Sequence, residues 1–369
     1  MWNYIQPTEI IFKHAALEEI DNLIQYTRGL LVIDEYFEKN GLAAKILKKS
    51  KKLVGFYSDI QPNPTLDNAD NCAAAIISNK VDFVLAIGGG SVLDCAKISA
   101  ALAKFSLKAA EVHSGEKKLT GIIGSSLPVI ALPTTAGTGS EVTAVSVLTD
   151  ESQKKKAPIL DFCLFPKLAI IDPELTVSMP PDVTAATGMD ALAHALEGFW
   201  SKNHQPICES LSLEAARKIF AALPAAFKNG TDIKARAEMC EASVMSGLAF
   251  ALPKTAGSHA CSYPLTGKYN LPHGEACALT LAAFTRINAS AESGRVDNFA
   301  KKLGFTGAHD MADHIDLLKK EMGLAMTLKD AKIPQNEIPT LAQLSQHPNM
   351  LNNPVDMTTD KLIEMYTAL

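Results

Sequence analysis

Short apolar runs alternate with helix-like segments along the first half of the chain, and this alternation is the strongest constraint on the fold. The apolar runs are rich in β-branched residues and lie at 30–34, 53–57, 82–87, 128–132 and 167–171. Helical patterns lie between them, near 36–49, 66–79 and 91–104. Strands that are joined by helical crossovers pair in parallel. The region therefore predicts an α/β domain with a parallel sheet and helices on both faces.

A polar turn interrupts this alternation between residues 142 and 169. Apolar and polar residues alternate on both sides of the turn, in the stretch TAVSVLTDESQKKKAPILDF. Alternation with a period of two around a polar turn is typical of a β-hairpin rather than a helix. We expect Lys154, Lys155 and Lys156 at the tip of this hairpin.

The strand signal ends at Pro180 and Pro181. From there to Leu369, Ala, Leu, Glu and Met recur at helical spacing. Proline cannot continue a helix and restricts the residue before it, so the pair is a natural boundary. A chain of 369 residues is also long enough for two cores. The sequence predicts an α/β domain over 1–180 and an all-α domain over 181–369.

Composition and charge exclude several classes of protein. Hydrophobic residues make up 47% of the chain and charged residues 20%, which is typical of a globular protein. The net charge of -5 would not attract a polyanion, so we expect no nucleic-acid partner. We find no signal-like start and no apolar run of membrane-spanning length, and expect a cytoplasmic protein without membrane contact. The seven cysteines form no CxxC pair and are expected to be reduced core thiols.

A glycine-rich turn joins an apolar strand to a helix in VLAIGGGSVLDCAK, residues 84–97. Glycines let the backbone approach a pyrophosphate, and the N–H groups at the start of the helix attract its negative charge. Gly88, Gly89, Gly90 and Ser91 are the candidate phosphate-binding residues, with Ser91 able to cap the helix. The spacing is not GxGxxG, so a tight turn without a ligand is the alternative.

A second polar loop, residues 133–141, follows the next strand, and a carboxylate ends the first strand. Ligands of parallel sheets bind beyond the carboxyl ends of the strands, where such loops meet. Two loops of this kind favour a dinucleotide. Asp34 would accept hydrogen bonds from the adenosine ribose and so favour NAD over NADP. The alternative is that Asp34 only caps a helix.

A third group of residues suggests a metal site. Asp190 and His194 are four residues apart, so on a helix they project from one face, about 40° apart. The flanking residues are apolar, which indicates that this face is buried. His259 and His273 complete a set of one carboxylate and three imidazoles that suits Fe²⁺ or, alternatively, Zn²⁺. Such an ion lowers the pKa of an alcohol while a nicotinamide ring accepts the hydride.

Six motifs occur in order along the chain: GGGSVLD, PTTAGTGSEVT, DPELT, GMDALAHALE, GSHA and PHGEA. With these motifs the sequence resembles the iron-containing (group III) alcohol dehydrogenases over nearly its whole length. The resemblance implies a Rossmann-like NAD(P)-binding domain, a helical domain and a cleft between them. It also implies a divalent metal, usually Fe²⁺, and a homodimer. The implied activity is hydride transfer between NAD(H) and a small alcohol or aldehyde.

The resemblance also assigns roles to individual residues. Asp190, His194, His259 and His273 match the four metal ligands. The matches to the cofactor-contacting residues are Gly88, Gly89, Gly90, Ser91, Asp94, Thr134, Thr135, Thr138 and the hairpin lysine Lys156. Asp34 matches a position where an acidic residue accompanies NAD, and NADP is the alternative cofactor.

The sequence departs from the family pattern near the third expected ligand. Four residues after His259 many members carry a further His, whereas this chain has Tyr263. Tyr263 either donates a hydrogen bond in its place or shapes the pocket. The string HACSYPLTGKYNLPHGEACA is similar to members that act on phosphonoacetaldehyde or hydroxyethylphosphonate. Such an anion would need a cation, and Lys254 or Lys268 lies near the expected ligands in sequence.

Two kinds of alternative function are considered. The same fold occurs in glycerol dehydrogenases and in dehydroquinate-synthase-like lyases, but the Asp and His pattern disfavours both. A nucleotide-binding module without catalysis is the alternative from another class, and the intact ligand set disfavours it.

Overall fold

The computed structural model describes residues 2–153 and 155–369, and these form two compact units. The sheet unit contains Ile5–Thr135 and Ser140–Thr176. The helical unit contains the residues up to Tyr4, Ala136–Gly139 and Val177–Leu369. No helix in the described ranges is both long and apolar enough to cross a membrane.

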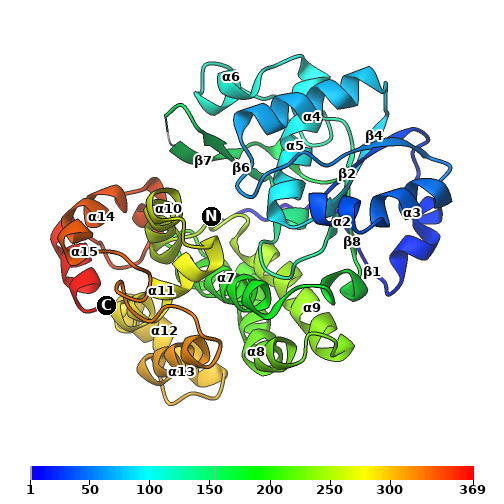
Figure 1. The fold of residues 1–369 in the computed structure, drawn as a ribbon. Helices are drawn as coiled ribbons and strands as arrows, with labels where there is room; N and C mark the ends of the chain where they lie inside the picture. The colour runs from blue at the N-terminus through cyan, green and yellow to red at the C-terminus, as the bar shows by residue number, and fades with distance from the viewer. Residues whose placement is uncertain (1, 154) are drawn as a thin grey trace. The chain divides into compact units, whose positions relative to one another are not determined.

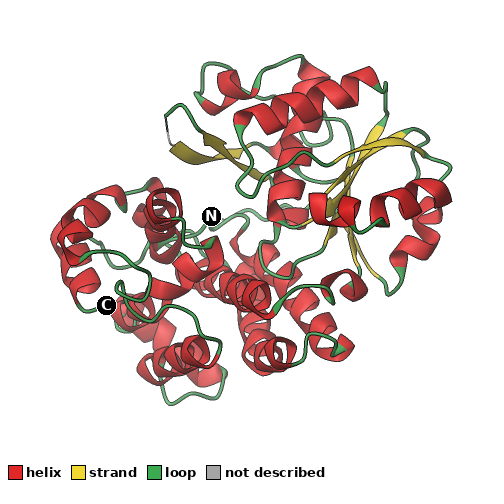
Figure 2. Cartoon of the chain, viewed as in Figure 1, coloured by secondary structure: helices red, strands yellow, loops and turns green. Residues whose placement is uncertain are grey.

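The sheet unit is built on six parallel strands (Figures 1 and 2). Across the sheet the order is β1 (Glu9–Phe12), β8 (Leu168–Ile171), β5 (Val129–Pro133), β4 (Phe83–Gly88), β2 (Gly29–Ile33) and β3 (Leu53–Tyr57). The five predicted strands are confirmed. β1 was not predicted, because it is an edge strand of four residues whose side chains are largely exposed and which therefore carries little apolar signal.

Helices cover both faces of this sheet. One face packs against α1 (Ile20–Leu23), α2 (Glu35–Lys39) and α3 (Leu42–Lys49), and the other against α4 (Leu66–Ser78) and α5 (Gly90–Phe105). Leu31 and Ile33 point to the first face while Leu30 and Val32 point to the second, so β2 is apolar on both sides. The predicted α/β fold with a parallel sheet is confirmed.

The single helix predicted over 36–49 is wrong, because it divides into α2 and α3. Gly41 lies between the two, with a left-handed φ of 85° that ends one helix and starts the next. A short helix, α6 (Ala109–His113), was not predicted.

The predicted hairpin is confirmed as antiparallel strands β6 (Val145–Asp150) and β7 (Lys155–Leu160). Its lysines are placed differently from the prediction. Lys155 and Lys156 belong to β7, where Lys156 pairs with Thr149, rather than to the tip. Lys154 lies outside the described residues.

The helical unit begins with Pro181 as the first residue of α7, a position where proline's fixed φ suits a helix and its missing N–H costs nothing. From Gly188 to Trp200 every residue of α7 is buried, since α8, α9, α10 and α11 pack around it. The helices are α7 (Pro181–Trp200), α8 (Pro206–Lys228), α9 (Ile233–Phe250), α10 (Gly257–Tyr269), α11 (His273–Ile287), α12 (Ala291–Lys302), α13 (Ala308–Glu321), α14 (Ile338–Leu344) and α15 (Thr359–Thr367). The predicted all-α fold is confirmed.

Short 3₁₀ helices connect these elements: η1 (Ala16–Glu19), η2 (Ser140–Val142), η3 (Phe162–Leu164), η4 (Pro173–Thr176), η5 (Gln335–Glu337) and η6 (Pro348–Asn352). The seven cysteines are all buried free thiols, as predicted.

Candidate metal centre and cofactor loops

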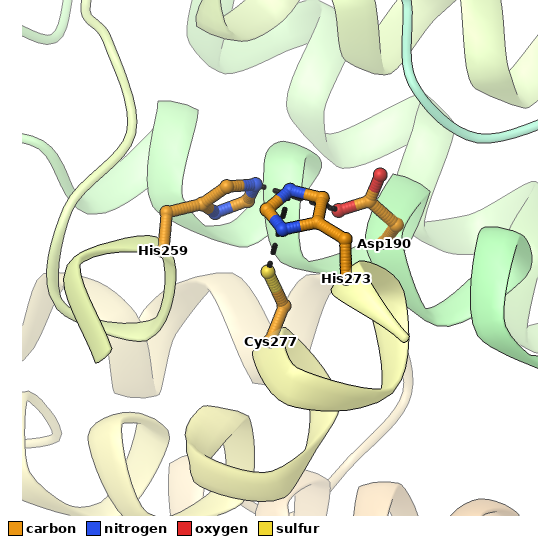
Figure 3. Close-up of side chains that lie close together, drawn as sticks. All are labelled: Asp190, His259, His273 and Cys277. Atoms are coloured by element: carbon orange, nitrogen blue, oxygen red, sulfur yellow. Dashed lines mark hydrogen bonds and ion pairs between the residues drawn. The ribbon is translucent and has the colours of Figure 1, made fainter. Parts of the chain in front are cut away.

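Three helices of the helical unit bring the predicted metal ligands together. Asp190 and His194 lie on α7, His259 lies in the first turn of α10, and His273 is the first residue of α11. The Asp190 Oδ1 atom is 3.4 Å from His259 Nε2 and 3.8 Å from His273 Nε2. His194 Nε2 is 2.9 Å from His259 Nε2. Figure 3 shows His259, His273 and Asp190 facing one another.

Each imidazole has a polar neighbour at its Nδ1 atom, and its Nε2 atom therefore points toward the other predicted ligands. His194 Nδ1 lies 3.2 Å from the carbonyl oxygen of Gly137, and His259 Nδ1 lies 2.5 Å from a Glu197 carboxylate oxygen. A carbonyl and a carboxylate only accept hydrogen bonds, so both Nδ1 atoms carry the proton. His273 Nδ1 is 3.4 Å from Ser262 Oγ, whose own proton goes to the His259 carbonyl.

This hydrogen bonding leaves unshared electron pairs converging on one point. With Nδ1 protonated on both rings, the Nε2 atoms of His194 and His259 face each other across 2.9 Å, which is repulsive unless a proton or cation lies between them. Asp190 Oδ1 is buried beside them and has no hydrogen-bond partner among the described residues. A buried acceptor without a donor is costly. These residues therefore fit a cation.

The charges in the site agree with this interpretation. Burial alone would raise the pKa of Asp190, but His194, His273 and His259 hold it well below its usual range, so the carboxylate is ionised. Burial lowers the pKa of His194 to about 4, which leaves that ring neutral and able to donate its Nε2 electron pair.

Glu197 supports the site but was not predicted. Its side chain is fully buried on α7 and accepts hydrogen bonds from the backbone N–H groups of Ser258 and His259 as well as from His259 Nδ1. A carboxylate behind a ligating imidazole orients the ring and raises its basicity. The signal was present in the sequence, because residues 190, 194 and 197 repeat at helical spacing along one face of α7.

Cys277 was expected to be a core thiol, and it is buried, but it also lies at the site. One ligand atom from each of Asp190, His259, His273 and Cys277 falls in a group whose members are within 4.8 Å of one another. The sulfur is 4.0 Å from His273 Nε2 (Figure 3). Burial raises the pKa of the Cys277 thiol. The spacing of four residues from His273 on one helix would have identified it.

Tyr263 lies one turn after His259 on α10. Its ring stacks on His347, with the ring centres 4.2 Å apart. Burial raises the pKa of Tyr263 to about 12, although Asn349 in η6 opposes the shift. Burial also lowers the pKa of His347 to about 4, so this pair is neutral near pH 7. The two lysines that were predicted to meet an anionic substrate lie in different surroundings. Lys268 forms an ion pair with Glu337, whereas Lys254 is exposed.

In the sheet unit the glycine turn lies between β4 and α5. Gly89 is the N-cap of α5 and has no side chain to cap it, so the cap predicted at Ser91 is wrong. The Ser91 hydroxyl instead accepts a hydrogen bond from the Asn63 N–H at 3.2 Å. A Cβ at Gly88 would lie 2.5 Å from that of Val92, so the turn requires glycine there. The second loop starts beside it, with Thr134 N–H donating to the Gly88 carbonyl at 3.0 Å.

Asn63 links two of the predicted cofactor residues and was itself missed. Its N–H bonds Ser91, and its side-chain oxygen accepts a hydrogen bond of 2.7 Å from Lys156. The backbone at Asn63 has a left-handed φ of 60°, a conformation in which Asn is enriched. The sequence signal was the turn PNP at 62–64.

Asp34 and Asp94 both have partners within the protein. Asp34 caps α2 by accepting a hydrogen bond from the Tyr36 N–H, as its alternative interpretation predicted. The Asp94 carboxylate accepts from the Ser140 hydroxyl and from the Val147 N–H, at 2.5 and 2.9 Å. Asp94 therefore ties the second loop and β6 to α5. A direct contact of either carboxylate with a cofactor stays a prediction, as do those of all the other residues predicted to bind it: Gly88, Gly89, Gly90, Ser91, Thr134, Thr135, Thr138 and Lys156.

Sequence comparison matches both halves of the chain to one family. Residues 7–173 match the iron-containing alcohol dehydrogenase pattern, and residues 184–369 match the C-terminal pattern of the Fe-containing alcohol dehydrogenase family. The long-chain-alcohol dehydrogenase 1 of Geobacillus thermodenitrificans is 33% identical, with 96% of this chain and 94% of that protein covered. The 1-propanol dehydrogenase of Citrobacter freundii is 36% identical, with 79% and 78% covered.

Among solved structures, the chain is similar to the sulfoacetaldehyde reductase of Bifidobacterium kashiwanohense, which was solved in complex with NAD⁺. The two share 46% sequence identity with a TM-score of 0.96, and 100% of this chain and 98% of that chain are covered.

Proposed function

The chain belongs to the iron-containing alcohol dehydrogenase family, and we propose that it reduces a short anionic aldehyde with NADH, or oxidises the corresponding alcohol with NAD⁺. In the oxidation, the carbon–hydrogen bond of the alcohol gives its electron pair and hydrogen to the nicotinamide, and the hydroxyl proton goes to solvent. The aldehyde and NADH are the products.

We assign the metal to Asp190, His194, His259 and His273. The observation that carries this assignment is the convergence of the His259 and His273 Nε2 atoms on Asp190 Oδ1, which has no hydrogen-bond partner among the described residues, with His194 Nε2 2.9 Å from His259 Nε2. Fe²⁺ is the expected ion and Zn²⁺ the alternative, because both accept imidazole and carboxylate donors. When bound, the ion supplies Lewis-acid stabilisation of negative charge on the substrate oxygen, and the nicotinamide supplies the hydride acceptor.

We assign the cofactor to the sheet unit, which corresponds to the predicted domain 1–180, and the metal to the predicted domain 181–369. The glycine turn at Gly88 and Gly89 would leave the first N–H groups of α5 for a pyrophosphate. Lys156, held through Asn63 beside Ser91, would place a positive charge at the same end of the sheet. Asp34 uses one carboxylate oxygen as a helix cap, and the other would accept the ribose hydroxyls of NAD.

The substrate that we propose is a two-carbon aldehyde with a sulfonate or phosphonate group. The similarity over the whole chain to a sulfoacetaldehyde reductase supports this choice, and the phosphonate alternative rests on the resemblance of the string around Tyr263. Sulfonate and phosphonate share a tetrahedral, negatively charged head, so one site would suit both.

Lys254 is the better candidate for the cation that meets this head group. Lys268 already forms an ion pair with Glu337, whereas Lys254 is exposed. The residue after Lys254 is Thr255, whose hydroxyl accepts a hydrogen bond of 2.7 Å from Asn349. Asn349 in turn lowers the pKa of Tyr263, which lies one turn from His259. With a pKa of about 12, the Tyr263 hydroxyl keeps its proton near neutral pH and would donate a hydrogen bond rather than take the alcohol's proton.

The test is an aldehyde panel with Fe²⁺- and Zn²⁺-loaded enzyme, NADH and NADPH. We expect kcat/KM to be highest with NADH and either sulfoacetaldehyde or phosphonoacetaldehyde, and the two arms decide between the head groups. Lys254→Gln should raise KM for the anionic aldehydes and leave KM for propionaldehyde unchanged. Lys268→Gln is the matched control and should change neither. Equal kcat/KM for charged and uncharged aldehydes would refute the proposed substrate class.

The seven buried free thiols are compatible with the cytoplasmic location predicted from the sequence, because a reducing compartment keeps thiols free. The homodimer also stays a prediction, which sedimentation of the purified protein would test.

A further inference from the structure

Cys277 lies in the second turn of α11 with its sulfur next to the predicted metal ligands. Its Sγ atom is 4.0 Å from His273 Nε2, and it belongs with Asp190 and His259 to a group of ligand atoms within 4.8 Å of one another. Figure 3 shows the sulfur facing the His273 ring rather than packed away from it. The four predicted ligands do not include this thiol.

The distances in this group are close to those between donor atoms that share one metal ion. Bonds of about 2.1 Å to nitrogen or oxygen and about 2.3 Å to sulfur place donors roughly 3.4 to 3.6 Å apart. The observed separations are 3.4 Å from Asp190 to His259, 3.8 Å from Asp190 to His273, and 4.0 Å from His273 to Cys277. Small side-chain rotations would therefore bring the sulfur to bonding distance.

Two further observations point to a ligand at this place. Asp190 Oδ1 is buried, has no hydrogen-bond partner among the described residues, and points into the same group. The helix spacing also repeats, since Asp190 and His194 on α7 are four residues apart and so are His273 and Cys277 on α11. Two donors at this spacing project from one helix face toward a single ion.

We propose that Cys277 is a direct donor to the metal ion of this centre. The thiol loses its proton to solvent on binding, and the ion–sulfur bond replaces the sulfur–hydrogen bond. Because sulfur is a soft ligand, this bond makes the site prefer Zn²⁺ and Co²⁺ over Mn²⁺ and Mg²⁺. The inference rests on the metal site of the proposed function and extends its ligand set.

The test is an anaerobic titration of the metal-free protein with Co²⁺, followed by absorption spectroscopy. Visible d–d bands report that Co²⁺ is bound, whereas an intense near-ultraviolet charge-transfer band reports a sulfur–cobalt bond. We expect both in the unaltered protein. In Cys277→Ala the charge-transfer band should disappear and Zn²⁺ affinity should fall by roughly tenfold or more, with a smaller change for Mn²⁺.

Cys208→Ala is the matched control, because it removes a buried thiol of the same unit that bonds Gln205 and Leu248 instead of the site. It should keep both bands. Cys277→Ser provides a second variant of nearly the same size if the alanine variant does not fold. Visible bands without the charge-transfer band in the unaltered protein would overturn the role of Cys277 and leave the metal site standing. Absence of any Co²⁺ binding by the folded protein would refute the metal site itself.

Discussion

Replacing Glu197 by Gln is the sharpest test of how the metal centre is held together. The carboxylate accepts hydrogen bonds from Ser258 N–H at 2.6 Å, His259 N–H at 3.3 Å and His259 Nδ1 at 2.5 Å. All three partners are donors, and the side chain is fully buried. An amide has the same shape but only one accepting oxygen, so one of its N–H groups must face a donor in either orientation.

The structure sets the size of the effect. Leaving one buried donor unpaired costs about 1–3 kcal/mol, which should appear as a lower free energy of unfolding of the metal-free protein. The His259 ring also loses the charge that fixes its tautomer, and changes behind a ligating imidazole weaken metal binding by about 10–100-fold. That range corresponds to about 1.4–2.7 kcal/mol.

Competition for Zn²⁺ with a chromophoric chelator measures the affinity, and urea unfolding of the metal-free protein measures stability. Glu275→Gln is the control, because Glu275 also accepts a hydrogen bond from a backbone N–H, that of Ala325 at 2.8 Å. We expect the control to bind Zn²⁺ like the unaltered protein. If Glu197→Gln binds Zn²⁺ within twofold of the unaltered protein, the carboxylate does not support the metal centre.

Three further changes test other parts of the argument. Gly274→Ala would place a Cβ 2.0 Å from the Ala186 carbonyl oxygen, so α11 should shift away from α7. The free energy of unfolding should fall by about 1–3 kcal/mol, and Zn²⁺ affinity should fall in the chelator assay. Burial raises the pKa of Glu141 from 4.5 to about 7. The unfolded chain therefore loses this proton first, and the free energy of unfolding should fall by about 3 kcal/mol from pH 4.5 to pH 8, a fall that Glu141→Gln removes in urea titrations. Asp34→Asn should keep the helix cap, and hence stability within about 0.5 kcal/mol, while raising kcat/KM with NADPH relative to NADH; unchanged cofactor preference would exclude Asp34 from selectivity.

The fold was predictable where a strand is buried on both faces. The run at 82–87 became β4 because its side chains from Phe83 to Ile87 are all apolar and have a core on each side. β1 was missed because an edge strand with exposed side chains needs little apolar sequence. The break at Gly41 was also missed, since the apolar pattern continues across α2 and α3 and only the positive φ of one residue separates them.

The site was predictable as far as residue type and motif carry chemistry, and unpredictable where a residue acts through a neighbour. Asp190 and the three histidines could be chosen from the sequence because few other side chains bind a metal. Glu197 and Cys277 share a helix face with predicted ligands, but this spacing alone does not bring them to the site, because their position there also depends on the packing of α7, α10 and α11. The same holds for Asn63, whose role depends on a turn beside Ser91 and Lys156.

The glycines in the predicted metal motifs explain how three helices come close enough for the side chains of the predicted ligands to approach one another. Gly274 follows His273, and a Cβ there would lie 2.0 Å from the α7 backbone at Ala186. Gly257 precedes His259 by two residues, and a Cβ there would lie 2.2 Å from the Phe284 ring of α11. Each glycine thus permits a close helix contact within two residues of a ligand. A larger side chain at either place would separate the helices and with them the donors. These motifs therefore specify the distance between helices as well as the predicted metal ligands.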